Sequence, residues 1–502
     1  MTMESDCLMM GDFARMLSPL IDDYPSNSDR SHGYAWWFSE HTINDRARFA
    51  NHRRRHRPPL RLLGHPGRLT IAYFTTLIVV MTALLMCPAA SRPTRYTPLS
   101  VAFFTAVSAL STCGISIVDT AGHWTMFGQG IILISVQLGG LGVMSFASII
   151  TIAVNRHMRA SQRVLTAEEL GTNRLSEIRS VLTLMVATTL SIELITFVAL
   201  FPGLWKINNK DLGRTLWEAV FFAVSSYNNA GFTPDYAGLH VNSWSVGLPI
   251  LLSAFAGTLG FPVLLNLLRS ARRGDGPRRW TLHTKLTLLT TGILVTLSLV
   301  WFLAVEWENP SLFKHADTAT RIRHALAAAV MPRTSGFDPS WVPQVSEPTK
   351  VFMSVMMFIG GGSTSTAGGI RVTTFAVILL ICRAAFTGHT DVNAFGRRLH
   401  TRTLMTAVSI TASCLTLVLS ASVGLMLLTG CSLTDALFET CSAFGLGGYS
   451  VGVASAADSG ATTLLALVMV LGRLGPMTIA YAINRPSGNE VVHYPTESIV
   501  VG

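Results

Sequence analysis

The chain has 502 residues, of which 49% are hydrophobic and only 13% are charged, and its mean hydropathy is +0.44. This composition is too apolar and too poor in charge for a soluble protein of this length, so we expect a membrane protein that crosses the bilayer several times. The net charge of +10 is scattered over loops beside the apolar stretches, which indicates membrane topology and lipid headgroup contacts, and we expect no nucleic-acid partner.

Residues 1–67 contain no apolar run and carry the basic sequence HRRRHR at 52–57. They match neither a signal peptide nor a transit peptide. We expect a cytoplasmic, basic N-terminal region that is poorly ordered or weakly helical.

Eight apolar stretches follow, and each is long enough for the roughly 20 residues that a helix needs to cross a bilayer. They lie near 69–90, 127–154, 181–204, 247–268, 284–305, 351–384, 403–429 and 462–483. Between each odd-numbered stretch and the next lies a semi-apolar segment that is too short to cross, such as LSVAFFTAVSALST or RTLWEAVFFAVSSYN. The links after the even-numbered stretches are rich in arginine, so we expect those links and both chain termini to be cytoplasmic.

The short segments align with one another on a glycine, in STCGI, NNAGF, RTSGF and GLGGY. A phenylalanine lies ten residues and a serine six residues before the glycine in three copies, whereas the third copy has Leu326 and Val330 there, followed by Met331 and Pro332. The anchor glycines are Gly114, Gly231, Gly336 and Gly448.

This internal repeat predicts an all-α polytopic membrane protein of four covalently linked units around a central pore. Each unit reads as a transmembrane helix, a re-entrant half-helix with an extended strand, and a second transmembrane helix. We expect the units at 68–155, 178–270, 281–385 and 402–485, followed by a cytoplasmic tail at 486–502.

The extended strands predict a selectivity filter, because irregular backbone inside a bilayer must be buried in protein or line a water-filled cavity. Backbone carbonyls can replace the water shell of a cation, and the C-terminal ends of half-helices favour positive charge. The alternative is a set of turn or packing glycines without ion contact. The expected filter residues are Thr112, Cys113, Gly114, Asn229, Ala230, Gly231, Thr334, Ser335, Gly336, Leu446, Gly447 and Gly448.

A second glycine-rich stretch, GGGSTSTAGGIRVTT at 360–374, interrupts the sixth apolar stretch. Its hydroxyl groups can satisfy freed backbone groups or solvate an ion, so we expect a flexible polar loop at 360–369 beneath the filter. A phosphate-binding loop is disfavoured, because the stretch lacks GKS or GKT. The loop residues are Gly360, Gly361, Gly362, Ser363, Thr364, Ser365, Thr366, Gly368 and Gly369.

Several charged residues lie in or near the membrane segments. Asp119, Asp235 and Asp338 follow three of the anchor glycines, either as acids that concentrate cations at a pore mouth or as ordinary turn residues. Glu193 lies inside the third stretch and is either functional or a packed structural contact. Arg473 lies near the middle of the last stretch, as a barrier in the ion path or as the buried partner of a carboxylate such as Glu193.

The membrane segments carry no GxSxG, HExxH or paired-carboxylate motif, so we expect no enzymatic activity. The seven cysteines form no CxxC pair, which supports neither a zinc site nor a disulfide framework.

From about residue 68 to the C-terminus the chain resembles the superfamily of K+ transporters that includes the bacterial Trk and Ktr translocating subunits and the plant HKT transporters. The similarity is greatest to the Ktr membrane subunit. It rests on FFTAVSALSTCGISIVDT, QLGGLGVMSF, SYNNAGF, GGGSTSTAGGIRVTTF, SAFGLGGYS, LGRLGPMT and the YPTESIVVG tail.

The resemblance implies potassium uptake across the plasma membrane, the inner membrane in bacteria, through a filter with a single ring of glycines. Carbonyls around Gly114, Gly231, Gly336 and Gly448 are then the K+ ligands. In the plant branch a serine at the first filter position accompanies Na+ preference, so Gly114 favours K+. Na+-selective uptake or Na+/K+ cotransport through the same pore is the alternative, and Na+ is a candidate activator.

The resemblance also implies how transport is controlled. The loop at 360–369 matches an intramembrane gate, and Arg473 in LGRLGP matches an arginine in the permeation path. The expected partners are a second copy of the chain, in a homodimer, and a ring of cytoplasmic nucleotide-binding regulatory subunits. No nucleotide is then expected on this chain itself.

Overall fold

The computed structural model describes residues 66–92, 97–142, 178–234, 244–274, 276–313, 317–333, 335–337, 339–389, 391–456 and 458–475. All of them belong to one compact unit, Leu62–Gly502. The expected N-terminal region and C-terminal tail therefore lie outside the described residues, apart from Pro66 and Gly67.

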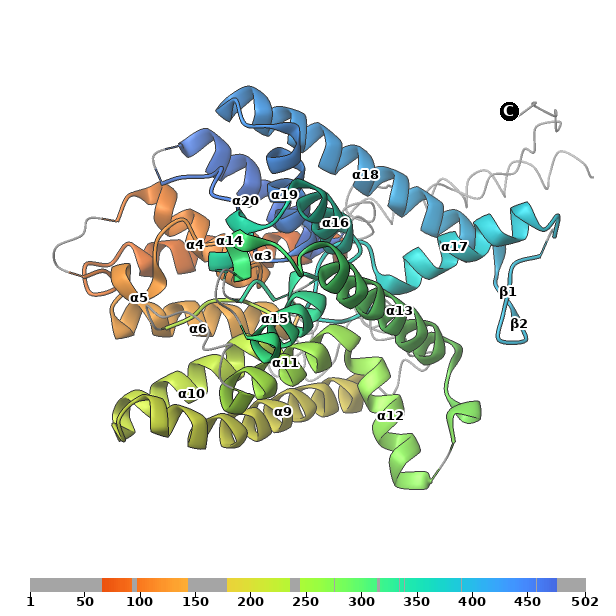
Figure 1. Ribbon diagram of the computed structural model, residues 1–502, viewed down its shortest axis with the longest axis horizontal. Helices are drawn as coiled ribbons and strands as arrows, with labels where there is room; N and C mark the ends of the chain where they lie inside the picture. Colours follow the sequence, from red (N-terminus) through yellow and green to blue (C-terminus); the bar gives the residue numbers. More distant parts are fainter. Residues whose placement is uncertain are drawn as a thin grey trace, which may run out of the picture. The chain divides into compact units, whose positions relative to one another are not determined.

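The described residues are almost entirely helical (Figure 1). The helices are α3 (Pro66–Leu85), α4 (Leu99–Ser111), α5 (Thr120–His123), α6 (Met126–Gly140), α9 (Ile178–Ile207), α10 (Leu212–Tyr227), α11 (Trp244–Leu259), α12 (Phe261–Arg273), α13 (Leu282–Val305), α14 (Pro310–Phe313), α15 (Thr318–Val330), α16 (Glu347–Phe358), α17 (Val372–Phe386), α18 (Thr401–Thr429), α19 (Leu433–Gly445) and α20 (Ser459–Leu474). Three 3-10 turns, η4 (Pro277–Arg279), η5 (Met331–Arg333) and η6 (Pro339–Gln344), and a hairpin of β1 (Asn393–Ala394) and β2 (Arg397–Arg398) complete the described structure.

Three described helices are long and apolar enough to cross a membrane: α9 from Thr183 onward, α13 and α18. They carry large apolar side chains that face outward, among them Ile195 on α9, Ile293 on α13 and Leu427 on α18, which are 67%, 57% and 83% exposed. Outward apolar surface over several helices is expected where lipid is the solvent. The expected all-helical polytopic membrane class is thus confirmed.

The fourth and eighth apolar stretches differ from the predicted straight spans. α11 and α12 together are long enough for a span, but they meet at a bend of 103°. The break falls at Gly260, whose φ is +86°. Pro262 lies in the first turn of α12, where a proline is tolerated, but it lacks the amide hydrogen that a continuous helix would need there. In the eighth stretch α20 ends at Leu474, before Gly475 with φ +75°.

The short helices α4, α10, α15 and α19 correspond to the four predicted half-helices. Their residues near the C-terminal ends are buried, and the repeated phenylalanines Phe104, Phe221 and Phe438 are each 0% exposed. In Figure 1, α4, α15 and α19 lie between the long helices α9 and α18. The phenylalanine repeat therefore marks core positions in three of the four short helices.

Candidate functional site

The four anchor glycines form a closed ring of backbone contacts, which we call the glycine ring. A Cβ atom on Gly114 would lie 2.1 Å from the Ala230 carbonyl oxygen, and one on Gly231 would lie 2.3 Å from the Ser335 carbonyl oxygen. One on Gly336 would lie 2.4 Å from the Cα of Gly448, and one on Gly448 would lie 2.6 Å from the Cys113 carbonyl oxygen, which closes the ring in chain order.

Each glycine of the ring also has a positive φ, with values of +89°, +68°, +58° and +79° in chain order. Side chains are disfavoured in this backbone conformation and no Cβ fits between the neighbouring segments. Glycine is thus required at all four positions by conformation and by space. The segments around them, 112–115, 229–232, 335–337 and 446–449, are called the ring segments.

The first two ring segments are held by the serine that lies six residues before the glycine. The carbonyl of Ser108 accepts a hydrogen bond from the Cys113 amide, and that of Ser225 from the Ala230 amide, both at 2.8 Å. The serine hydroxyls donate to the carbonyl of the residue after the glycine, at 2.7 Å and 2.9 Å respectively. The repeated serine is therefore a structural clamp on the ring segment.

The third copy is held differently, because Pro332 cannot continue the helix. α15 ends at Val330 and the chain tightens into η5, so the Ser335 amide bonds to the Met331 carbonyl at 2.9 Å. Thr334 lies outside the described residues.

Electrostatics at the ring favour a cation. The half-helices α4, α10 and α19 end immediately before it, and Thr112, Asn229 and Leu446 leave these helices in the left-handed conformation. The C-terminal end of a helix carries partial negative charge. The ring combines these helix ends with closely packed backbone. Backbone carbonyl oxygens at such a surface can replace the water shell of a cation.

The glycine-rich loop, residues 359–371, joins α16 to α17 and its two ends lie side by side. Ile359 and Ile370 form a parallel bridge, with hydrogen bonds from the Gly360 amide to the Ile370 carbonyl and from the Ile370 amide to the Phe358 carbonyl. A Cβ on Gly360 would lie 1.9 Å from the Gly368 carbonyl oxygen. The loop glycines thus permit a closed loop rather than a merely flexible one.

Thr366 fastens this loop to the ring segments. Its hydroxyl accepts a hydrogen bond from the Asn229 amide group at 2.7 Å, and its carbonyl accepts from the Thr112 hydroxyl at 3.1 Å. Asn229 accepts in turn from the Ser335 hydroxyl at 2.7 Å. Arg473 donates to both the Thr366 carbonyl, at 2.6 Å, and the Thr112 hydroxyl, at 3.2 Å. One loop residue therefore connects three ring segments with α20.

Other loop residues lie against neighbouring helices. The Gly362 amide donates to the Thr258 carbonyl at the end of α11, and the Gly369 amide donates to the Phe444 carbonyl in α19. A Cβ on Gly361 would lie 2.8 Å from the Thr258 carbonyl oxygen. Ser363, Thr364 and Ser365 form the partly exposed tip.

Arg473 lies at the end of α20, not near the middle of a straight helix as predicted, because α20 stops at Leu474. Its third acceptor is the Gly139 carbonyl in α6. A Cβ on Gly472 would lie 2.1 Å from the Phe444 carbonyl oxygen, so this glycine lets α20 approach α19 closely. The guanidinium therefore lies between the first ring segment, the loop and α6, where it holds the loop.

Glu193 does not serve as the carboxylate partner of Arg473. It accepts hydrogen bonds from the side-chain amides of Gln137 and Asn228, both at 3.2 Å. Asn228 is the C-cap of α10 and directly precedes the second ring segment. Glu193 is thus a buried structural contact between α9, α6 and that segment.

The acids predicted at a pore mouth are only partly described. Asp119 caps the short helix α5 by accepting a hydrogen bond from the Gly122 amide at 2.8 Å, which fits the role of a turn acid. Asp235 and Asp338 lie outside the described residues.

Three charged residues near the site were missed by sequence reasoning. Arg333 is 2% exposed and donates to the Gly360 carbonyl at 3.1 Å, which links the third copy to the start of the loop. Arg371 donates to the Ala367 carbonyl at 2.7 Å and so braces the loop from within. Glu439 is fully buried in α19. Their signal was available in the sequence, because charge within an apolar segment is costly and marks a structural or functional contact.

A helical membrane chain in which four backbone segments meet in a ring, above a loop held by an arginine, has the architecture of a cation-transport protein. Comparison with known proteins specifies the family. The TrkH family, described as a cation transport protein family, matches residues 51–492. The chain belongs to the TrkH family, which unites cation uptake transporters of the Trk and Ktr kind. The chain is a transporter and not an enzyme, as predicted.

Relatives in several bacteria support this assignment. The chain is 30% identical to "Ktr system potassium uptake protein B" of Bacillus subtilis over 87% of this chain and 96% of the relative. It is also 30% identical to "Potassium/sodium uptake protein NtpJ" of Enterococcus hirae, over 87% and 97%. The fold is similar to that of the potassium transporter TrkH from Vibrio parahaemolyticus, with a TM-score of 0.66, 16% identity, and 86% and 87% of the two chains covered. The predicted resemblance to the Trk, Ktr and HKT superfamily is confirmed.

Proposed function

We propose that this protein takes up potassium across the plasma membrane through a selectivity filter formed by the glycine ring. The observation that carries the proposal is the closure of the ring, in which each anchor glycine packs against the backbone of the next ring segment. Backbone carbonyl oxygens are the ligands that select among alkali cations, so four ring segments in mutual backbone contact support this role. The ion is cargo.

The choice of potassium rests on Gly114 and on the relatives. Gly114 leaves the anchor position of the first ring segment without a side chain, and the names of both relatives include potassium. Na+-selective uptake or Na+/K+ cotransport is the second candidate, because the Enterococcus relative is named for sodium as well. Na+ as an activator belongs to the same alternative.

Control of transport is assigned to the loop. What supports this assignment is that Thr366 and Arg473 hold the loop against the ring segments, where a loop would obstruct an ion that leaves the ring. A ring of cytoplasmic nucleotide-binding subunits would open the path by pulling the loop or α20 away. We expect the working unit to be a homodimer with both termini in the cytoplasm. We keep the predicted boundaries of the four repeat units, 68–155, 178–270, 281–385 and 402–485, in this proposal.

Three measurements test the proposal. Expression in a host that lacks potassium uptake should restore growth at low potassium, and Rb+ uptake should persist in excess Na+. Rb+ uptake abolished by equal Na+ would favour the sodium candidate, and no uptake of either ion would refute the proposal.

Purification with and without a co-expressed regulator, followed by mass measurement, tests the assembly. A monomer that ignores the regulator would overturn that part.

A further inference from the structure

The fourth ring segment lacks the clamp that holds the first two. Within the described residues the Ser442 hydroxyl is buried and has no hydrogen-bond partner, although Ser442 occupies the same repeat position as Ser108 and Ser225. Only its carbonyl retains the common role, accepting from the Gly447 amide at 2.8 Å. A different group must therefore hold the chain beyond Gly448.

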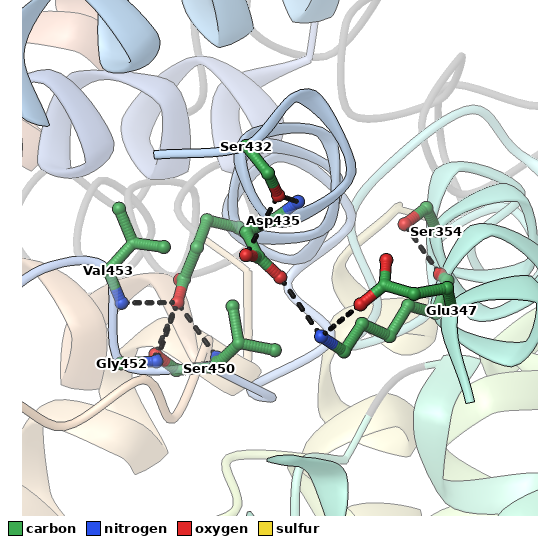
Figure 2. A network of polar contacts seen from close by, with 10 residues as sticks. Glu347, Ser354, Ser432, Asp435, Ser450, Gly452 and Val453 are labelled. Atoms are coloured by element: carbon green, nitrogen blue, oxygen red, sulfur yellow. Dashed lines mark hydrogen bonds and ion pairs between the residues drawn. The ribbon is translucent and has the colours of Figure 1, made fainter. Parts of the chain in front are cut away.

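That group is the carboxylate of Glu439, one helical turn before Ser442 on α19. Figure 2 shows Ser450, Gly452 and Val453 converging on a single carboxylate oxygen, which is Oε1 of Glu439. The Ser450 hydroxyl donates at 2.6 Å, and the amides of Val451, Gly452 and Val453 donate at 2.9, 3.1 and 3.3 Å.

The carboxylate is specific to the fourth copy. The residue nine positions before the anchor glycine is Glu439 there, but Thr105, Phe222 and Ala327 in the other three copies. A carboxylate that accepts several backbone amides in a buried place makes stronger hydrogen bonds than a neutral acceptor. The stretch that follows the fourth ring segment, residues 450–453, is thus fixed by one charged residue of its own half-helix.

The contact also bears on neighbouring segments. The Tyr449 hydroxyl donates to the Phe337 carbonyl at 2.9 Å, and the Cys113 thiol lies 3.8 Å from the Ser442 carbonyl. A shift of residues 450–453 would pass through Tyr449 to the third ring segment. We infer that Glu439 is a positioning residue that sets the outer geometry of the glycine ring and, through it, the discrimination between K+ and Na+. This inference rests on the proposed filter function.

The test uses two variants of the full-length protein and one control. Glu439→Met keeps the side-chain length and removes every acceptor, whereas Glu439→Gln keeps one acceptor oxygen without the charge. Asp435→Asn is the control, because Asp435 lies one turn earlier on α19 and contacts Lys350 and Ser432 (Figure 2). Deuterium exchange at the amides of 451–453 and the Na+ concentration that halves Rb+ uptake are measured for each.

Exchange should accelerate about tenfold in Glu439→Met and less in Glu439→Gln, and the half-inhibitory Na+ concentration should fall in the same order. Asp435→Asn should match the wild type in both. Unchanged selectivity in Glu439→Met would overturn the inference. If Glu439→Met fails to assemble, unchanged exchange and selectivity in Glu439→Gln overturn it. A wild type without Rb+ preference refutes the proposed filter instead, while the exchange measurement still reports on Glu439.

Discussion

Replacing Gly114 by serine tests the geometry of the glycine ring. The added Cβ would lie 2.1 Å from the Ala230 carbonyl oxygen and 3.3 Å from the Cα of Gly231. Normal contact between such atoms requires about 3.5 Å, so the neighbouring carbonyl must move by roughly an ångström or more. The positive φ of +89° adds strain of about 1–3 kcal/mol for a residue with a side chain.

This strain sets the expected loss of selectivity. If about 1.4 kcal/mol of it is relieved by moving the Ala230 carbonyl away from its position for K+, discrimination between K+ and Na+ falls about tenfold. The assay is Rb+ uptake under increasing Na+, where we expect the half-inhibitory Na+ concentration to fall by that factor. The control is Gly430→Ser, because Gly430 also has a positive φ, +67°, but open space around it. Gly114→Ser protein at normal abundance with wild-type Na+ competition would refute the geometry.

Two further changes test the gate. Deleting residues 361–367 should raise Rb+ uptake without loss of assembly, because Gly360 already lies against Gly368 and the cut ends can join; an assembled protein that conducts no better would show the loop to be structural. Arg473→Ala removes the cation that holds Thr366. We expect about tenfold higher uptake, which corresponds to the free energy of one charge-assisted hydrogen bond. We also expect uptake to depend less on a cytoplasmic regulator. Wild-type uptake in a well-folded Arg473→Ala protein, with Arg473→Lys as the matched control, would contradict the gate.

The positions of the glycine ring were predictable from sequence because they are set by local conformation. A positive φ in a crowded place is compatible only with glycine. A glycine therefore occurs at the same position in each of the four copies of the repeat. The buried phenylalanines were visible for a similar reason, since each fills the same core position. The glycine content of 360–369 likewise indicated a break in an apolar helix.

The contacts that join the loop to the ring were not predictable. Thr366 and Asn229 are 137 residues apart, and Thr112 and Arg473 are 361 apart, so only the folded chain brings these pairs together. The ends of α11 and α20 were predicted wrongly. Hydropathy alone favoured continuous helices, whereas the Gly-Phe-Pro and Gly-Pro sequences stop them. The charge of Glu439 inside an apolar half-helix was visible in the sequence, but its contacts were not, because three of its four partners are backbone amides.

The most direct test of the glycine ring as the ion site is a crystal structure of the protein grown in Rb+, with anomalous scattering used to locate the ion. The ring predicts an anomalous peak enclosed by carbonyl oxygens of the four ring segments, on the side of Thr366 that faces the glycines. The peak should vanish when Na+ replaces Rb+. Ordered ring segments without a peak, together with Rb+ bound elsewhere in the membrane region, would contradict the assignment.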